Sequence, residues 1–129
     1  MSESPTQRTM KKLREDGYKP WIVEKFNRFA GPHGVRQDMF GVIDIVATRP
    51  GRILGVQSCG QAFSAHDRDL MGVKRKDCYD WMEAGGELEL WGWRKILRVE
   101  ASGKKGKVKI WSPRIKIYTL EDFYPDWTS

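Results

Sequence analysis

The chain has 129 residues, of which 40% are hydrophobic, and a formal net charge of +6. This length predicts one domain, residues 1–129, with its own core, and the hydrophobic content excludes a disordered chain. No apolar run approaches the roughly 20 residues that span a bilayer, so we expect no membrane association. With only Cys59 and Cys78 and no apolar signal sequence, we expect a reduced, cytoplasmic protein.

One helix and three strands are predicted in the first half of the chain. Residues 6–16 place Met10 and Leu13 on one helical face, and Gly17 can end the helix. The strands are expected at 21–26, 39–48 and 53–58. Glycine and proline make 29–36 a loop, and a Pro-Gly turn joins the last two strands into an antiparallel hairpin.

The second half predicts a long helix and three more strands. Ser64 and Asp67 form a weak capping box at the start of the helix, which continues to about Ala84. Apolar residues recur along it at helical spacing and should face a sheet. The strands are expected at 87–93, 95–100 and 107–111. This order of elements predicts an α/β fold with a mixed central sheet flanked by helices.

Basic residues are concentrated in 94–116, which we expect to form a C-terminal hairpin. The segment contains nine Lys or Arg residues and one acidic residue, Glu100. Such a block predicts a polyanion as partner. Alternatively, its lysines keep an edge strand soluble. Trp111 could stack on an unpaired base or pack across the strands against Trp91 or Trp93.

A single carboxylate, Asp44, lies inside the apolar hairpin. A buried charge is unfavourable unless it is compensated, and a divalent cation can compensate a carboxylate. The segments FGVIDIVA and LGVQSC, with DMFGVID at 38–44 and AGGELELWGWRK at 84–95, resemble the core of the PD-(D/E)XK nuclease superfamily. The likeness covers residues 11–95 and is greatest to Holliday-junction resolvases and similar small phage-type endonucleases. It implies a restriction-endonuclease-like core and Mg²⁺- or Mn²⁺-dependent hydrolysis of DNA, structured or branched.

The resemblance makes Asp44 a metal ligand and places Gln57, Ser58 and Cys59 where the superfamily has an acidic residue, any residue and lysine. The amide oxygen of Gln57 can ligate a hard cation, and the Ser58 carbonyl could join it. Cys59 cannot supply the positive charge of the missing lysine. Asp38 could add a second carboxylate on the same face of an unbroken strand, or it could cap a turn.

Two residues on the predicted long helix could replace that lysine. Lys74 lies near the sheet-facing side, although it could instead extend to the surface. His66, in the first turn, could act as a base or could be a polar surface residue. His33 lies beside Arg36 in a glycine-rich loop and is suited to phosphate contact or proton transfer, or it could be a polar surface residue. Further acidic candidates for the site are Glu15 and Glu24.

The resulting hypothesis is a DNA endonuclease of this superfamily. The predicted catalytic residues are Asp44, Gln57, Lys74 and His66, and the predicted metal ligands are Asp44, Gln57, Ser58 and Asp38. The predicted DNA-binding residues are Arg36, His33, Arg94, Lys95, Lys104, Lys105, Lys107 and Lys109.

Two alternatives remain open from the sequence. The altered Gln57-Ser58-Cys59 triplet favours a DNA-binding or assembly protein that keeps the nuclease fold and does not cut. The basic surface could also meet an acidic protein partner. Resolvase-like relatives act as two-fold dimers, so the resemblance implies a homodimer as well.

Overall fold

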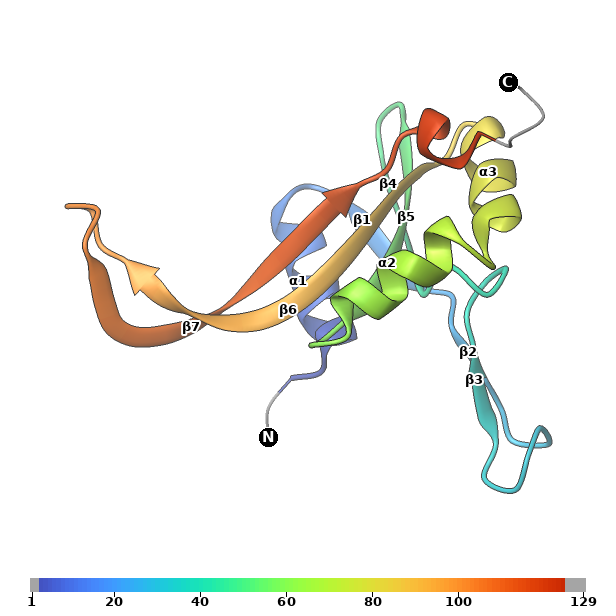
Figure 1. Ribbon diagram of the computed structural model, residues 1–129, viewed down its shortest axis with the longest axis horizontal. Helices are drawn as coiled ribbons and strands as arrows, with labels where there is room; N and C mark the ends of the chain where they lie inside the picture. Colours follow the sequence, from blue (N-terminus) through green and yellow to red (C-terminus); the bar gives the residue numbers. More distant parts are fainter. Residues whose placement is uncertain (1–2, 125–129) are drawn as a thin grey trace.

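A five-stranded mixed sheet forms the centre of the computed structural model, which describes residues 3–124 (Figure 1). In spatial order its strands are β1 (Lys19–Ile22), β4 (Ile45–Arg49), β5 (Arg52–Cys59), β6 (Glu87–Val99) and β7 (Lys105–Ile117). Only β5 and β6 are parallel neighbours, and α2 (Phe63–Met71) and α3 (Arg75–Glu83) form the crossover that a parallel pair requires. The predicted α/β fold with a mixed sheet and flanking helices is confirmed.

One face of the sheet is covered by α1 (Pro5–Glu15). The helix starts at a capping box in which the Ser4 hydroxyl accepts from the Gln7 N–H, while the Gln7 side chain accepts from the Ser4 N–H. Met10 and Leu13 are buried against the inward side chains of β4, β5 and β6. The helix predicted at 6–16 is therefore confirmed, and its apolar face is the one that the spacing indicated.

The opposite face is covered by α2, α3 and the short 3-10 helix η1 (Leu120–Phe123). Figure 1 shows α2 in front of the sheet and α1 behind it. Phe63 of α2 packs so closely on β6 that a Cβ added at Gly92 would lie 2.6 Å from its ring. A side chain at position 92 would therefore push α2 away from the sheet.

The helix predicted from Ser64 to Ala84 is broken. Residues 72–74 separate α2 from α3, because Gly72 ends the first helix with a non-helical ψ of −102°. The predicted capping box is wrong as well. Ala62 is the N-cap and makes no side-chain hydrogen bond there. Asp67 instead accepts hydrogen bonds from Lys116 of β7 and from Tyr118.

The predictions around the first strands were also partly wrong. The strand predicted at 21–26 ends at Ile22, and β2 (Lys25–Asn27) pairs with β3 (Val35–Gln37) in a separate ribbon. The latter strand includes the end of the predicted loop. The strand predicted at 39–48 starts only at Ile45, because Phe40 and Gly41 adopt positive φ angles of 59° and 70° in a turn. The predicted hairpin between 39–48 and 53–58 is confirmed as β4 and β5.

The basic C-terminal hairpin is longer than predicted. Instead of two strands at 87–93 and 95–100, β6 continues without a break from Glu87 to Val99, and β7 pairs with it from Glu89 to Val99 with one irregularity between Leu97 and Val99. The distal part, residues 94–112, extends beyond the body of the protein (Figure 1), and we call it the arm. Within residues 3–124, no helix combines the length and apolar content that a bilayer crossing needs.

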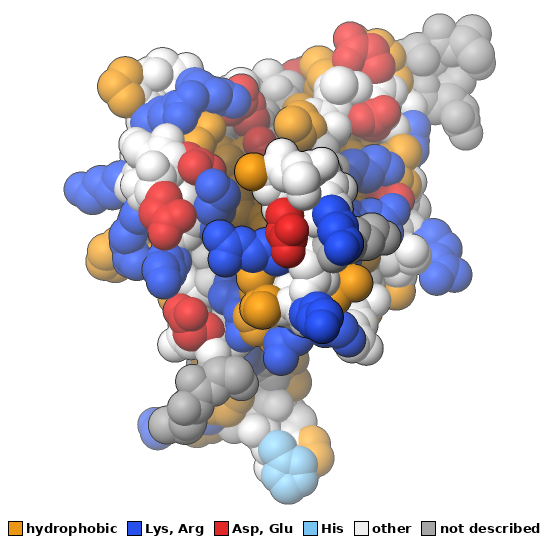
Figure 2. All heavy atoms as spheres, turned by 90° about the vertical axis from the view of Figure 1, so that its left-hand side faces the viewer, with side chains coloured by type: hydrophobic (Ala, Val, Ile, Leu, Met, Phe, Trp, Pro, Cys, Tyr) orange, Lys and Arg blue, Asp and Glu red, His pale blue; other side chains and the backbone are white. Residues whose placement is uncertain are grey.

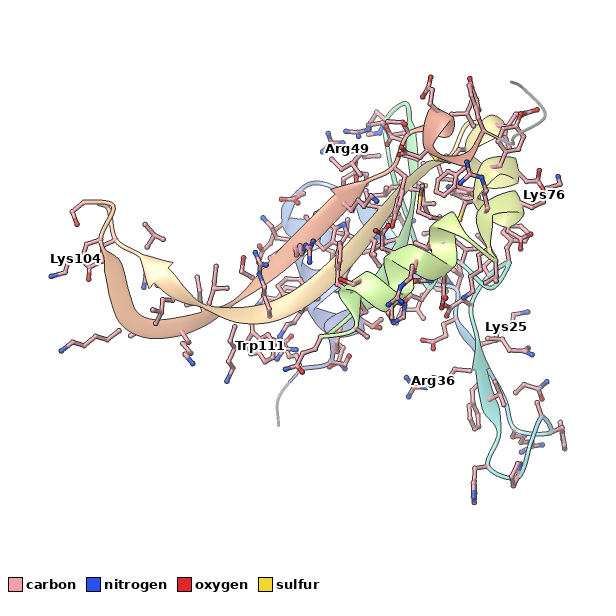
Figure 3. All side chains as sticks on the ribbon, viewed as in Figure 1. Lys25, Arg36, Arg49, Lys76, Lys104 and Trp111 are labelled. Atoms are coloured by element: carbon pink, nitrogen blue, oxygen red, sulfur yellow. The ribbon has the colours of Figure 1, made fainter. Side chains whose placement is uncertain are left out.

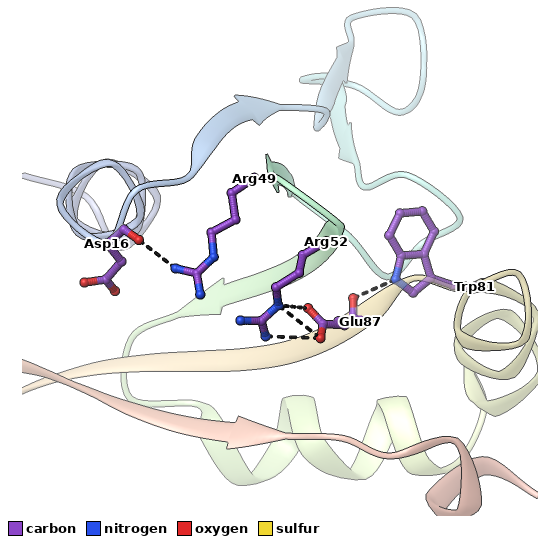
Figure 4. Close-up of polar contacts among 5 residues, drawn as sticks. All are labelled: Asp16, Arg49, Arg52, Trp81 and Glu87. Carbon is purple, nitrogen blue, oxygen red and sulfur yellow. Dashed lines mark hydrogen bonds and ion pairs between the residues drawn. The ribbon is translucent and has the colours of Figure 1, made fainter.

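Polar contacts at the end of the sheet opposite the arm join the strands to one another and to the helices (Figure 4). Arg49 donates to the Asp16 carbonyl at 2.9 Å, and Arg52 forms a bidentate pair with Glu87 across β5 and β6. Trp81 of α3 donates to the Glu87 carbonyl at 2.8 Å. The Arg52–Glu87 pair is exposed and screened by solvent, so it contributes little to stability and mainly fixes the strand register.

A buried hydroxyl joins α1 to two strands. Thr9 is fully buried, and its hydroxyl donates to the Pro5 carbonyl at 2.8 Å. Having one proton, it must accept the other two contacts, from Trp93 Nε1 and from the Ser58 hydroxyl, both at 2.8 Å. Thr9 therefore couples the position of α1 to β5 and β6.

We expect Thr9→Val to lower the free energy of unfolding by about 3 kcal/mol, because it leaves the Trp93 and Ser58 donors without an acceptor. Thr9→Ser keeps the hydroxyl and should lose no more than about 1 kcal/mol. Urea unfolding of both variants measures the difference. Equal losses in the two variants would contradict a role for the hydroxyl.

Candidate functional site

Asp44 is buried directly before β4, with 6% of its surface exposed. Both of its carboxylate oxygens accept from the Ser58 N–H, each at 3.1 Å, and its own N–H donates to the Val56 carbonyl. Burial raises the pKa of Asp44 to about 7 against the opposing effect of the Ser58 hydrogen bond, and the negative charges of Asp38 and Glu24 raise it further. At neutral pH this carboxyl therefore exchanges readily between its protonated and ionised forms.

Gln57 lies beside Asp44 on the face covered by α2. Ile45 pairs with Val56 in this antiparallel hairpin. Asp44 and Gln57 are therefore opposite each other, and their side chains leave the same face of the sheet. The side chain of Gln57 is 2% exposed, and both ends of its amide are hydrogen-bonded. Nε2 donates to the Val42 carbonyl at 2.7 Å, and Oε1 lies 2.8 Å from His66 Nδ1.

This arrangement determines the tautomer of His66. The Val42 carbonyl can only accept, so Gln57 must direct its NH₂ group toward it and its oxygen toward the ring. Nδ1 of His66 must then carry a proton. In the neutral ring the lone pair is left on Nε2, which is the form that can take up a proton from a nucleophile.

Asp38 and Lys74 meet in a depression of about 490 Å³, which Arg36 also lines. Burial raises the pKa of Asp38, and the charges of Lys74 and His66 act in the opposite direction. Asp44 does not line this depression, but its carboxyl and that of Asp38 are close enough to repel. The structure therefore brings Asp38, Asp44, Gln57, His66 and Lys74 into one neighbourhood, as their predicted shared role requires.

Two of these residues reach the site by a different route from the predicted one. Asp38 was expected to share a strand face with Asp44, but a turn lies between them and folds Asp38 back. Lys74 was expected inside a long helix, but it is the N-cap residue of α3, in the break after α2. The break turns the chain so that Lys74 faces the turn at 38–41.

The donor atoms suit a hard cation better than zinc. Within residues 3–124, no three His, Cys, Asp or Glu side chains converge to hold a metal. Mg²⁺ needs fewer protein ligands, because it commonly binds through one or two carboxylates, water and substrate phosphates. Asp38 and Asp44 fit that pattern. Ser58 contributes its N–H to Asp44, and its hydroxyl faces α1.

Position 59 offers no positive charge. Cys59 is buried, and burial together with the negative charge of Asp44 raises the pKa of its thiol to about 11. The side chain therefore stays neutral at physiological pH. It can neither replace a catalytic lysine nor act as a thiolate nucleophile.

The predicted DNA-binding residues lie on two projections. Arg94, Lys95, Lys104, Lys107 and Lys109 are exposed on the arm, whereas the side chain of Lys105 lies outside the described residues. Viewed from the arm side, Lys and Arg side chains cover much of the surface (Figure 2).

The second projection is the β2–β3 ribbon. Figure 3 shows Lys104 at the tip of the arm and Arg36 on this ribbon, whose terminal loop carries His33. His33 is exposed there, and no contact joins it to the Asp44 neighbourhood among residues 3–124.

Glu15 and Trp111 do not have the predicted surroundings. Glu15 belongs to α1, on the face of the sheet opposite Gln57 and His66, so the structure does not bring it to Asp44. Trp111 pairs across the strands with Lys95, and neither Trp91 nor Trp93 is its direct partner. Its ring is covered by Arg8 of α1, a residue that the sequence analysis did not single out.

The raised pKa of Asp44 predicts a pH-dependent gain in stability for Asp44→Asn. An acid whose folded pKa of about 7 exceeds its ordinary value of 3.8 destabilises the fold as the pH rises through that interval. The variant should exceed the wild type by about 4 kcal/mol at pH 8, with the gap closing toward pH 4. Urea unfolding at several pH values tests this, with the exposed Asp80→Asn as control. A gap that does not change with pH would contradict it.

The Gln57 amide predicts the tautomer of His66. We expect ¹⁵N chemical shifts of neutral His66 to show a protonated Nδ1, because Gln57 Oε1 can only accept. Gln57→Leu removes that acceptor and should release the preference, whereas His33 should be unaffected. A wild-type ring protonated on Nε2 alone would show that the amide is oriented the other way.

Comparison of the chain with family models, curated proteins and solved structures gives no match. The resemblance to PD-(D/E)XK nucleases therefore rests on the residues quoted for it.

Proposed function

We propose that the protein is a metal-dependent endonuclease that hydrolyses phosphodiester bonds in DNA, with structured or branched DNA as its substrate. The main support is the buried Asp44, which lies beside the oriented Gln57–His66 pair and near Asp38 and Lys74. A buried acid, a fixed imidazole and a lysine near one depression are the groups that phosphoryl transfer needs.

The residues that would hold Mg²⁺ or Mn²⁺ are Asp44 and Asp38, with the second lone pair of Gln57 Oε1 as a third donor. When bound, the ion would acidify water and neutralise charge in the transition state. The Ser58 N–H keeps the carboxylate of Asp44 in place and favours its ionised form. The hydroxyl of the same serine is bonded to Thr9 and so ties Ser58 to α1.

His66 and Lys74 would share the task of the missing lysine. His66 presents Nε2 as the basic atom and could accept a proton from the attacking water. Lys74 brings a positive charge to the Asp38 side of the depression, where it would stabilise negative charge that develops on the phosphate. Neither role needs a charge from Cys59.

The arm and the β2–β3 ribbon would bind the DNA backbone. Exposed lysines and arginines on a two-stranded ribbon give affinity through phosphate contacts, which do not read base sequence. Two symmetric cuts in a branched substrate would require two copies of the chain, so we include a two-fold homodimer in the proposal.

A second candidate is a DNA-binding or assembly protein with this fold that does not cut. The neutral, buried Cys59 favours it, because the position holds no charge for catalysis. The two candidates differ in cleavage and agree in DNA binding.

A nuclease assay on four-way junctions and linear duplexes with Mg²⁺ or Mn²⁺ tests the proposal. Wild type should cut, Asp44→Asn should lose roughly a hundredfold or more in rate, and Asp80→Asn should not. His66→Gln should lose roughly a hundredfold without weaker DNA binding. Mg²⁺ should also raise the unfolding temperature of the wild type, and not that of Asp44→Asn. DNA binding without cleavage by the wild type would favour the second candidate.

A further inference from the structure

A groove of about 320 Å³ lies between α1 and the base of the arm, on the face of the sheet opposite Gln57 and His66. Trp93, Trp111 and Pro113 line it from the sheet, and Arg8 and Lys11 line it from α1. Figure 3 shows Trp111 beside α1 where the arm leaves the body. Nothing in the proposed catalytic chemistry uses this groove.

Arg8 is the unusual residue in the groove. It is only 9% exposed, and its guanidinium carbon lies 3.8 Å from the centre of the Trp111 ring. Among residues 3–124 it forms no ion pair with an acidic side chain. Its nitrogen atoms are not sealed from solvent either, so they open into the groove. The guanidinium therefore directs N–H donors that pair with no acidic side chain of residues 3–124 into a groove open to solvent, which leaves them available to an anion.

The stack on Trp111 orients Arg8 for that anion. Stacking uses the flat face of the guanidinium and leaves its N–H donors free at the rim. These donors form a planar fork that matches two oxygens of a phosphate. The tryptophan, which the sequence suggested as a platform for bases, is covered on this side and instead holds the arginine.

The residues that line the groove carry both positive and negative charges. Glu3 and Glu15 also line it, and Lys12 is paired with Asp16 at 3.2 Å. A diffuse basic surface therefore does not explain the position of Arg8. The neighbouring lysines that add to it are Lys11 on the helix and Lys95, whose Nζ lies 5.3 Å from the centre of the Trp111 ring.

The groove is also tied to the candidate active site. Thr9, next to Arg8, is hydrogen-bonded to the Ser58 hydroxyl, and the Ser58 N–H holds the Asp44 carboxylate. Arg8 is thus linked to Asp44, the proposed metal ligand on the other side of the sheet, through its neighbour Thr9 and two hydrogen bonds.

We propose that this Arg8 groove binds a backbone phosphate of the DNA that lies along the arm, through the guanidinium fork of Arg8 with help from Lys11. The proposal rests on DNA being the substrate, and it adds a contact outside the basic hairpin and outside the catalytic neighbourhood.

Binding of a labelled four-way junction at several salt concentrations tests the groove. Arg8→Gln should weaken binding about tenfold and reduce the slope of log affinity against log salt by about 1, the value for one lost phosphate contact. Arg8→Lys should recover part of the affinity, because it keeps the charge and loses the fork. The matched control is Lys76→Gln, an exposed charge on α3 far from the arm (Figure 3), which should change neither quantity. Equal affinity and slope for Arg8→Gln and Lys76→Gln would overturn the proposal.

A second variant protects the test against unfolding of Arg8→Gln. Lys11 is exposed, so Lys11→Gln should keep the wild-type unfolding temperature and still weaken DNA binding about threefold. If Arg8→Gln unfolds and Lys11→Gln binds as the wild type does, the groove is not a phosphate site.

Inorganic tripolyphosphate separates this proposal from the endonuclease proposal. It should quench tryptophan fluorescence in the wild type and not in Arg8→Gln or Trp111→Phe. Arg8-dependent binding of DNA without Mg²⁺-dependent cleavage would remove the endonuclease proposal and support the groove. Cleavage that is insensitive to Arg8, with no response to tripolyphosphate, would overturn the groove alone.

Discussion

The hydrogen bond from the Ser58 N–H to the Asp44 carboxylate is the contact on which the site depends. It holds a buried acid directly before β4, where no ion pair with a Lys or Arg among residues 3–124 compensates the charge. The same serine uses its hydroxyl to bind Thr9 on the opposite face of the sheet. Because one residue serves both faces, the position of the carboxylate is set by the packing of α1 as well as by the strand pairing. A substitution that shifts α1 should therefore also shift the Asp44 carboxylate.

The irregular parts of the chain bring the remaining residues to that carboxylate. A short connection from β5 to α2 places His66 in reach of Gln57, and the amide of Gln57 is in turn oriented by the Val42 carbonyl. Regular strand and helix would have kept Asp38 and Lys74 apart. The positive φ angle of Phe40 folds Asp38 back, and the break at Gly72 turns Lys74 toward it. Local departures from regular structure thus assemble the depression.

The sequence predicted the parts of this arrangement that depend on local pattern. The first helix follows from spacing and capping, and Asp44 was identified because a carboxylate in an apolar strand is unusual. The break after α2 and the β2–β3 ribbon were missed, because pairing and packing with distant residues override local propensity there. The tautomer of His66 depends on a backbone carbonyl that no pattern indicates. Arg8 looks like any solvated helix residue until Trp111, near the other end of the chain, is placed beside it.

The cysteine at position 59 helps to explain the raised pKa of Asp44. A lysine at that position would stabilise the ionised carboxylate and lower its pKa. With a neutral thiol there, burial outweighs the backbone N–H groups that favour the carboxylate, and with the negative charges of Asp38 and Glu24 it raises the pKa of Asp44 to about 7. The negative charge of Asp44 must then be compensated by a proton or by a bound cation. Because the carboxyl is partly protonated near neutral pH, uptake of a divalent ion there would release a proton from it. The cysteine at position 59 therefore leaves the ionised form of Asp44 dependent on a cation from outside the fold, as the proposed metal-binding role of this residue requires.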